Sequence, residues 1–226
     1  MKILTISDTH SQHRRVPKEW LVPADMIIHA GDVSNVGKLN EIEDFCMWYD
    51  SLDYKYKIFC AGNHDWGFQR EPDKVAEIIA AYPSITYVQD EMIIVDGVKI
   101  YCSPWQPEFM NWAFNLERGE EIKEKWDAIN EECEILVTHG PVYGILDLAP
   151  GDRYVGCVDL LETITIRLKK LSTHICGHIH GAHGSEYKHG KTFINASVLN
   201  ERYIIAYKPI LLEFDKETRK SKLTEI

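Results

Sequence analysis

The chain has 226 residues, of which 25 are basic and 35 acidic, and its formal net charge is −10. That length suits one domain with a sizeable core, and we expect residues 1–226 to form a single domain. The acidic balance argues against binding of long nucleic acid, which usually requires a net basic surface.

The six cysteines form no CxxC pair, and several lie inside apolar runs. We interpret them as buried free thiols in a reducing compartment, because a chain of this length does not need disulfides. No apolar run approaches the ~20 residues of a membrane span, and no signal peptide is evident. We therefore expect a cytoplasmic protein without a membrane partner.

Short apolar runs and amphipathic patterns alternate along the chain. Five runs have the character of strands that end in turn residues: 2–7, 25–30, 56–61, 134–138 and 172–176. Four segments have helical spacing of apolar residues: 38–51, 72–82, 118–130 and 157–171. Asp96-Gly97 predicts a hairpin between two further strands, and the chain is strand-rich from Thr192. This alternation predicts a layered α/β fold.

A polar residue of the type that binds metals follows each of the five predicted strands. These residues are Asp8, Asp32, Asn63, His139 and His178. Ligands of open α/β sheets bind beyond the carboxyl ends of the strands. We therefore expect five separate segments to deliver these side chains to one place.

The local motifs add two more candidate ligands, His10 in Asp8-Thr9-His10 and His180 in His178-Ile179-His180. Residues two apart in an extended segment point to the same side, so Asp8 and His10 could bind one ion. His178 and His180 could diverge to two ions, and the two carboxylate oxygens of Asp32 could bridge both. Each motif alone is weak, but five motifs in this order, each after a strand, favour a metal site.

The donor set combines oxygen and nitrogen without sulfur. Such ligands suit Mn, and also Fe, Zn, Co or Ni, better than Ca or Mg alone. The absence of cysteine ligands disfavours a structural zinc site. The sequence thus predicts two divalent metal ions as cofactors.

The set of motifs resembles that of the calcineurin-like metallophosphoesterases. The resemblance covers roughly residues 1–200, and extends to Ser103-Pro104-Trp105-Gln106-Pro107, to Trp112-Ala113-Phe114-Asn115 and to Ile194-Asn195-Ala196-Ser197. These runs are similar to a subgroup that includes the animal metallophosphoesterase-domain proteins and resembles class III cyclic-nucleotide phosphodiesterases. The resemblance implies a four-layer α/β/β/α sandwich.

The resemblance also implies a ligand assignment. One metal would be bound by Asp8, His10, Asp32 and His180, and the other by Asp32, Asn63, His139 and His178. His64 would face the substrate and act in catalysis.

Two ions ~3.5–4 Å apart could bind a bridging hydroxide that attacks phosphorus in line. His64 could protonate the leaving alkoxide or bind a phosphate oxygen. Asp65 could orient His64 or its loop, or could cap the turn.

Several further residues have both a functional and a structural interpretation. We interpret His29 and His174 as structural, and His183 as a residue that could line the cleft. Arg153 could clamp a phosphate, although a solvated loop arginine is the simpler interpretation.

A cluster of four aromatic residues between positions 105 and 114 also has two interpretations. It could offer a platform for a nucleobase, but we favour a core position for most of its members. The cluster comprises Trp105, Phe109, Trp112 and Phe114. Asn195 and Ser197 could support the metal ligands.

We predict a metal-dependent phosphoesterase that acts on phosphodiesters of small, nucleotide-like substrates. Two alternatives remain open: a phosphomonoesterase or protein phosphatase, and a metal-dependent nucleotide-binding scaffold with weak activity. Protein phosphatases of this superfamily carry Gly-Asp-x-x-Asp-Arg-Gly, whereas the stretch from Gly31 to Gly37 lacks that arginine. The full ligand set argues against the scaffold.

Overall fold

Two six-stranded sheets form the centre of the computed structural model, which describes residues 1–224. The first sheet has the order β16-β15-β1-β2-β3-β4. Its strands are β1 (Lys2–Ile6), β2 (Met26–His29), β3 (Tyr56–Phe59), β4 (Ile85–Tyr87), β15 (Ile210–Asp215) and β16 (Lys220–Thr224). The second sheet has the order β13-β14-β12-β9-β6-β5. Its strands are β5 (Glu91–Val95), β6 (Val98–Ser103), β9 (Ile135–Thr138), β12 (Thr173–Cys176), β13 (Gly184–Lys188) and β14 (Lys191–Asn195).

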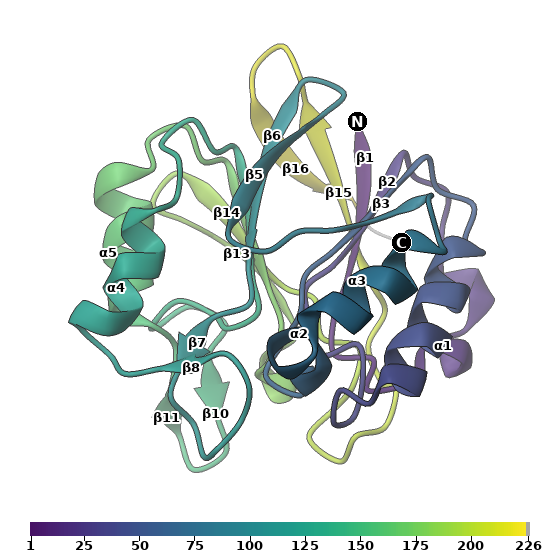
Figure 1. Ribbon diagram of the computed structural model, residues 1–226. Coiled ribbons are helices and arrows are strands. Elements are labelled where there is room, and N and C mark those ends of the chain that lie inside the picture. Colours follow the sequence, from purple (N-terminus) through teal and green to yellow (C-terminus); the bar gives the residue numbers. More distant parts are fainter. Residues whose placement is uncertain (225–226) are drawn as a thin grey trace.

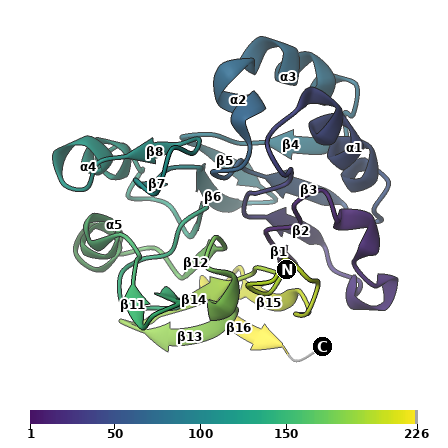
Figure 2. The ribbon, with the colours of Figure 1, turned by 90° about the horizontal axis from the view of Figure 1, so that it is seen from below.

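Helices cover the outer face of each sheet (Figures 1 and 2). The first sheet is covered by α1 (Leu39–Asp50), α2 (Trp66–Arg70) and α3 (Pro72–Ala80), and the second by α4 (Glu120–Asp127) and α5 (Val158–Glu162). The central strands are mostly apolar because both of their faces are buried. All four residues of β2 and all four of β9 are buried.

Three apolar clusters separate the layers. The one between the two sheets contains Ile3 and Ile28 from the first sheet and Ile100 and Val137 from the second. The others lie under α1–α3 and under α4 and α5. The predicted four-layer α/β/β/α sandwich is therefore confirmed.

The predicted hairpin and two of the four predicted helices form largely as the sequence indicated. Asp96 and Gly97 have φ values of 50° and 80°, as a tight hairpin turn requires. The helix predicted over 118–130 is shorter, since it begins after Gly119, whose φ is 87°.

The helix predicted over 157–171 is also shorter than expected. α5 ends at Glu162, and a π-helical turn follows over Thr163–Arg167. The first four residues of this segment, Thr163 to Ile166, are β-branched and lose side-chain freedom in a helix. The Thr165 hydroxyl donates to the Leu161 carbonyl at 2.8 Å, a bond that competes with regular helical geometry.

The carboxyl ends of the parallel strands of both sheets point to one end of the molecule. β1 to β4 run parallel in the first sheet, as do β6, β9, β12 and β14 in the second. A parallel bridge between Ser7 and Ser197 joins the two sheets there. In Figure 1 this is the lower end, opposite the N-terminus. Four short strands also lie there: β7 (Gln106–Pro107), β8 (Asn115–Leu116), β10 (Leu148–Ala149) and β11 (Arg153–Tyr154).

All six cysteines are buried free thiols, as the sequence predicted. Within residues 1–224, no helix has the length and apolar character needed to cross a membrane.

Candidate metal centre

All seven predicted ligands lie at the carboxyl ends of the parallel strands. Asp8 follows β1, Asp32 follows β2 and Asn63 follows β3, while His139 and His178 follow β9 and β12. Backbone hydrogen bonds join these strand ends. The Asp8 N–H donates to the Gly31 carbonyl at 3.0 Å, and the Gly177 N–H donates to the His139 carbonyl at 2.9 Å.

One group of candidate ligands comprises Asp8, His10 and His180. Their candidate donor atoms lie within 4.8 Å of one another. His180 Nε2 lies 3.4 Å from Asp8 Oδ1 and 3.3 Å from His10 Nε2. All three side chains are at least nine-tenths buried, so their donors point into one shielded space.

A second group comprises Asp32, His139 and His178, again with donor atoms within 4.8 Å of one another. Asn63 completes it, because its Oδ1 lies 2.8 Å from both His139 Nε2 and His178 Nδ1. The four residues expected as the second ligand group therefore lie together, and their binding of a metal stays a prediction.

Asp32 lies between the two groups. Its Oδ2 atom is 3.5 Å from His10 Nε2 in the first group and 3.3 Å from His139 Nε2 in the second. A single carboxylate oxygen thus faces donors of both groups, which is the arrangement that a shared ligand requires.

Two backbone carbonyls fix which imidazole nitrogen faces the centre. His139 Nδ1 donates to the Ala30 carbonyl at 3.0 Å, and His180 Nδ1 donates to the Asn200 carbonyl at 3.2 Å. A carbonyl oxygen only accepts, so each Nδ1 carries hydrogen and each neutral ring presents the Nε2 lone pair inward. Metal-binding histidines are usually held in this way. Convergent lone pairs and carboxylates fit divalent cations.

Without a metal, the histidines of the centre differ in their affinity for protons. Burial opposes the charged form of His139, but the Asp32 carboxylate outweighs burial and raises the pKa of His139 to about 9. Burial would raise the pKa of Asp32, but His139 and its hydrogen bond hold it well below the usual range. Burial lowers the pKa of His10 to about 4 and that of His178 to about 3.

Four of the seven ligands have left-handed backbone, which is unusual for residues other than glycine. Their φ values are 55° for Asp8, 41° for His10, 55° for Asp32 and 68° for His178. The expectation that Asp8 and His10 converge because they lie in an extended segment is therefore wrong. They converge because the chain turns sharply after β1. Such strain persists where the surrounding structure enforces it, often at functional sites.

Two glycines allow the ligand loops to approach closely. A Cβ on Gly62 would lie 2.4 Å from Asp32 Oδ1, and one on Gly177 would lie 2.1 Å from Asp8 Oδ2. Neither position has room for a side chain. Glycine at these two motif positions therefore allows the Asp32 and Asp8 carboxylates to pack directly against the loop backbone.

His64 lies at the edge of the centre, with a ring nitrogen within 4.8 Å of the donor atoms of His10 and Asp32. Its Nδ1 donates to the Asn35 carbonyl at 2.6 Å. The two candidate ligand groups described above do not include His64, and its contact with the substrate stays a prediction.

Asp65 joins two ligand loops rather than contacting the His64 ring. Its fully buried carboxylate accepts hydrogen bonds from the N–H groups of Val33, Ser34 and Gly62, and from the Ser34 hydroxyl at 2.6 Å. It therefore fixes the loop after β2 to the loop after β3. The sequence left open whether Asp65 orients His64 or its loop, or only caps a turn. The structure favours a role in holding the loop.

The comparisons with known proteins agree with this geometry. The family model "Calcineurin-like phosphoesterase" matches residues 1–182. The chain belongs to the calcineurin-like phosphoesterase family. It is 37% identical to human metallophosphoesterase domain-containing protein 1, over 94% of this chain and 70% of that protein. It is 36% identical to the UPF0046 protein K07C11.7 of Caenorhabditis elegans, over 96% of this chain and 77% of that protein.

Solved structures share the fold. TT1561 of Thermus thermophilus aligns with a TM-score of 0.65 and 14% identity, over 99% of this chain and 97% of that one. An archaeal protein described as a novel phosphodiesterase aligns with a TM-score of 0.52 and 16% identity, over 99% of both chains. Membership of the family supports metal-dependent hydrolysis of phosphoester bonds.

Within this family fold, the aromatic cluster divides into two parts. Phe114 is buried and Trp105 packs against the core, as expected. The core interpretation is wrong for Phe109 and Trp112. Phe109 is 51% exposed and lines a pocket beside the centre, and Trp112 stacks on His64. Both lie in a loop between β7 and β8, whose course depends on contacts distant in sequence.

The structure shows the contacts of four further residues to which the sequence analysis gave a structural or functional interpretation. His29 and His174 are buried, with ring nitrogens 3.0 Å from the Thr9 hydroxyl and 2.7 Å from the Thr138 hydroxyl, as expected of structural residues. His183 stacks on Tyr207 at 4.7 Å and does not line the pocket beside the centre. Asn195 Nδ2 donates to the Ile179 carbonyl at 2.9 Å, between two ligands.

Ser197 supports Asn195 in turn. Its backbone N–H donates to Asn195 Oδ1 at 3.1 Å. The pair therefore braces the loop that carries His178 and His180, the supporting position that the sequence suggested.

A pocket of about 440 Å³ adjoins the His178 and His180 side of the centre. Its wall includes the exposed rings of Phe109 and Tyr203 and the side chains of Arg118 and Arg153. Sequence reasoning missed Tyr203 and Arg118. Tyr203 contacts the rings of His10 and His180 at centroid distances of 5.0 and 4.9 Å, but no local pattern marks it.

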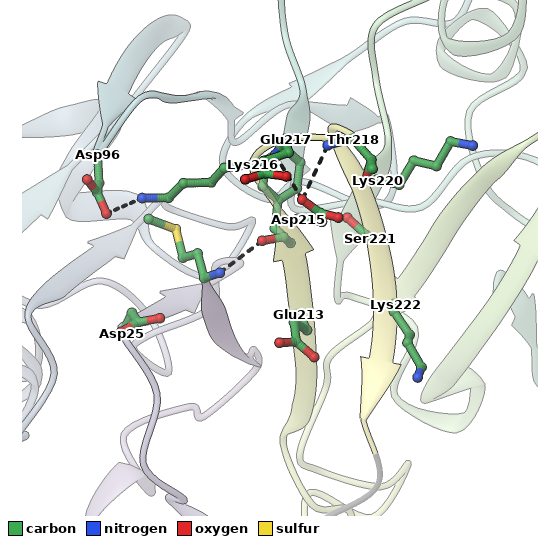
Figure 3. Close-up of a pocket in the computed structure, with 12 residues that line it drawn as sticks. Asp25, Asp96, Glu213, Asp215, Lys216, Glu217, Thr218, Lys220, Ser221 and Lys222 are labelled. Carbon is green, nitrogen blue, oxygen red and sulfur yellow. Dashed lines mark hydrogen bonds and ion pairs between the residues drawn. The ribbon is translucent and has the colours of Figure 1, made fainter.

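A second cleft, of about 730 Å³, lies by the amino end of β1 and the β15–β16 turn, at the opposite end of the strands (Figure 3). Of the described residues that line it, none is a histidine. Lys216 pairs there with Asp96, and Asp215 accepts hydrogen bonds from the N–H groups of Glu217 and Thr218. This cleft has no part in the metal centre.

Proposed function

We propose that this protein hydrolyses phosphodiesters of small, nucleotide-like substrates at a centre of two divalent metal ions. One observation carries the proposal: Asp32 Oδ2 faces His10 Nε2 at 3.5 Å and His139 Nε2 at 3.3 Å, and these belong to separate ligand groups. Asp8, His10, Asp32 and His180 would hold one ion. Asp32, Asn63, His139 and His178 would hold the other. Mn is the proposed metal, with Fe, Zn, Co or Ni as alternatives.

When bound, two such ions supply a water nucleophile at neutral pH and neutralise charge on the phosphoryl group. The protein holds the metal-binding side chains in position. Buried carbonyls orient the imidazoles of His139 and His180, and Asp65 holds the loops in register. These contacts fix the reaction geometry before substrate arrives, which lowers the entropic cost of the reaction.

In this proposal, His64 contacts the substrate. Its Nδ1 is engaged by the Asn35 carbonyl, so Nε2 is the nitrogen available to the phosphoryl group or the leaving oxygen. As the imidazolium, with hydrogen on both nitrogens, His64 could donate from Nε2 to the leaving oxygen and give up that proton as the alkoxide departs.

The preference for nucleotide-like diesters rests on the pocket beside the centre. Phe109 and Tyr203 are 51% and 47% exposed, and their rings could flank a flat group of the substrate. Arg118 donates to the Gly156 and Val155 carbonyls at 2.7 and 2.6 Å, which holds its guanidinium at the pocket wall. A diester has a second substituent that could fill this space, whereas a simple monoester has none.

The competing functions make different predictions. A phosphomonoesterase or protein phosphatase would prefer p-nitrophenyl phosphate or a phosphopeptide over bis(p-nitrophenyl) phosphate. A nucleotide-binding scaffold would bind nucleotide with little turnover of any ester. The net charge of −10 makes long nucleic acid an unsuitable substrate. The buried free thiols favour the proposed cytoplasmic location.

The decisive experiment is a panel of phosphoesters assayed with metal-stripped protein to which each divalent ion is returned. We expect no turnover after chelation, recovery with Mn, and faster turnover of diesters than of monoesters. His189→Asn, in the exposed turn between β13 and β14, serves as a control and should match the unmodified protein. Undiminished turnover in metal-free protein would contradict the two-metal centre. Preference for monoesters would contradict the substrate class.

A further inference from the structure

Trp112 makes a close face-to-face contact with His64. The ring centroids are 4.0 Å apart and the planes are inclined by 24°. His10 meets the same imidazole edge-on at 4.5 Å. The Asn35 carbonyl accepts its Nδ1 hydrogen at 2.6 Å. Three neighbours thus restrict the His64 ring, and Nε2 has no hydrogen-bond partner among residues 1–224.

The loop that carries Trp112 is attached to the loop that carries His64. The Ala113 N–H donates to the Asn63 carbonyl at 3.0 Å. The Phe114 N–H donates to Gln69 Oε1 at 3.0 Å, and Gln69 belongs to α2, which begins two residues after His64. The backbone that follows Trp112 is therefore attached both to the residue before His64 and to the helix after it.

The position of Trp112 is not explained by the hydrophobic core. Trp105 and Trp126 pack in the apolar clusters of the described chain, but Trp112 belongs to none of them. It is half-buried, and the ring it stacks on is the imidazole at the edge of the metal centre. A flat indole against a flat imidazole limits rotation of the histidine while leaving its edge free.

We propose that Trp112 is a positioning residue that holds the His64 imidazole with Nε2 directed to the phosphoryl group. This inference rests on the proposed function of His64. Without the indole, the imidazole can rotate about its side-chain bonds, and the fraction of molecules with Nε2 correctly placed falls. Small losses of alignment at a reacting group can cost up to about 100-fold in rate.

The test combines Trp112→Ala, Trp112→Phe, His64→Ala and the double variant Trp112→Ala/His64→Ala. We expect Trp112→Ala to lower kcat for bis(p-nitrophenyl) phosphate about 10-fold, with KM changed less than about 2-fold. Trp112→Phe should retain most of the activity because its ring can stack. In the His64→Ala background, Trp112→Ala should change kcat by less than about 2-fold, because the residue it positions is gone. Metal content should be unchanged in every variant.

A second readout does not depend on turnover. The Nδ1 hydrogen of His64 should give a slowly exchanging NMR signal in protein labelled with ¹⁵N-histidine, assigned by its loss in His64→Ala. The signal should persist in Trp112→Phe and exchange about 10-fold faster or more in Trp112→Ala. Trp20→Leu, in the short helix Lys18–Trp20 that packs against the apolar cluster under α1–α3, is the control for loss of a tryptophan. Trp112→Leu replaces the alanine variant if that variant does not fold.

Two results would overturn the inference. If Trp112→Ala lowers kcat by the same factor with and without His64, Trp112 acts independently of His64. If KM rises and kcat does not fall, Trp112 contacts the substrate instead. Failure of the underlying proposal has a different signature, since His64→Ala alone would then leave kcat unchanged.

Discussion

Asp32 Oδ1 accepts a 2.8 Å hydrogen bond from the backbone N–H of His64, so the carboxylate between the two ligand groups also holds the loop that carries His64. The other oxygen, Oδ2, faces His10 and His139. One side chain therefore connects both ligand groups with the residue expected to contact substrate. The consequences of this arrangement can be measured.

Asp32→Ala should lose both metal ions and essentially all activity. Its carboxylate is the only side chain assigned to both groups, and its removal also frees the His64 loop. Elemental analysis of the purified variant, alongside His189→Asn, measures the metal content. A variant that keeps two metals per chain would contradict the shared role of Asp32.

His180→Ala should have a smaller effect on metal content than Asp32→Ala. His180 lies beside Asp8 and His10, in one group only. We expect loss of about one metal per chain and a large fall in rate, since mutation of ligands or their supports commonly weakens binding by about 10- to 100-fold or more. Titration of metal-free protein with Mn measures the number of remaining sites. Loss of both ions at saturating Mn would show that the two groups do not bind independently.

His64→Ala should bind metal normally but turn over about 10²- to 10⁴-fold more slowly. If His64 protonates the leaving oxygen, the deficit should shrink for esters with an acidic leaving group such as nitrophenol. The measurement is the rate against leaving-group pKa for the unmodified protein and the variant. An equal loss for good and poor leaving groups would instead assign His64 to phosphate binding, and loss of a metal would make it a ligand.

Metal binding should release protons at neutral pH. In the metal-free protein the Asp32 carboxylate raises the pKa of His139 to about 9, so His139 is protonated at pH 7.5 and must lose that proton to bind a metal. Metal affinity should therefore fall as the pH decreases below about 9, and no proton should come from His139 above that pH. Calorimetry in buffers of different ionisation enthalpy measures the protons released. A heat of binding that does not depend on the buffer would refute the prediction.

Asp65→Ala should destabilise the protein by about 3 kcal/mol, because it leaves the buried N–H groups of Val33, Ser34 and Gly62 without acceptors. Metal affinity should also fall, since these groups belong to the loops that carry Asp32 and Asn63. Urea unfolding of the metal-free variant gives the stability change. Asp53→Ala, in the loop before β3 where the residue is exposed, is the control and should stay within about 0.5 kcal/mol of the unmodified protein. Equal stability of the two variants would contradict the role of Asp65.

The sequence by itself determined the five strands that precede the candidate ligands, the hairpin at Asp96-Gly97 and the candidate ligands, but not the short strands β4, β7, β8, β10 and β11. Apolar runs such as 25–30 form buried parallel strands, because only apolar residues suit a strand covered on both faces. The polar residues that follow them, Asp8, Asp32 and His139 among them, lie at one end of the sheets because parallel strands share a direction. The motif resemblance then indicated the pairing of the two sheets, which periodicity does not encode.

Only the tertiary structure decided how Asp8 and His10 converge and which aromatic residues surround the candidate metal centre. The sharp turn after β1 brings Asp8 and His10 together through left-handed backbone, which strand alternation does not predict. Trp112 reaches His64, and Tyr203 reaches His10 and His180, across long separations in the chain. The sequence specifies the size and polarity of each side chain. Its orientation in a loop depends on contacts with distant backbone, as when Ala113 donates to the Asn63 carbonyl, and these exist only after the sheets have packed.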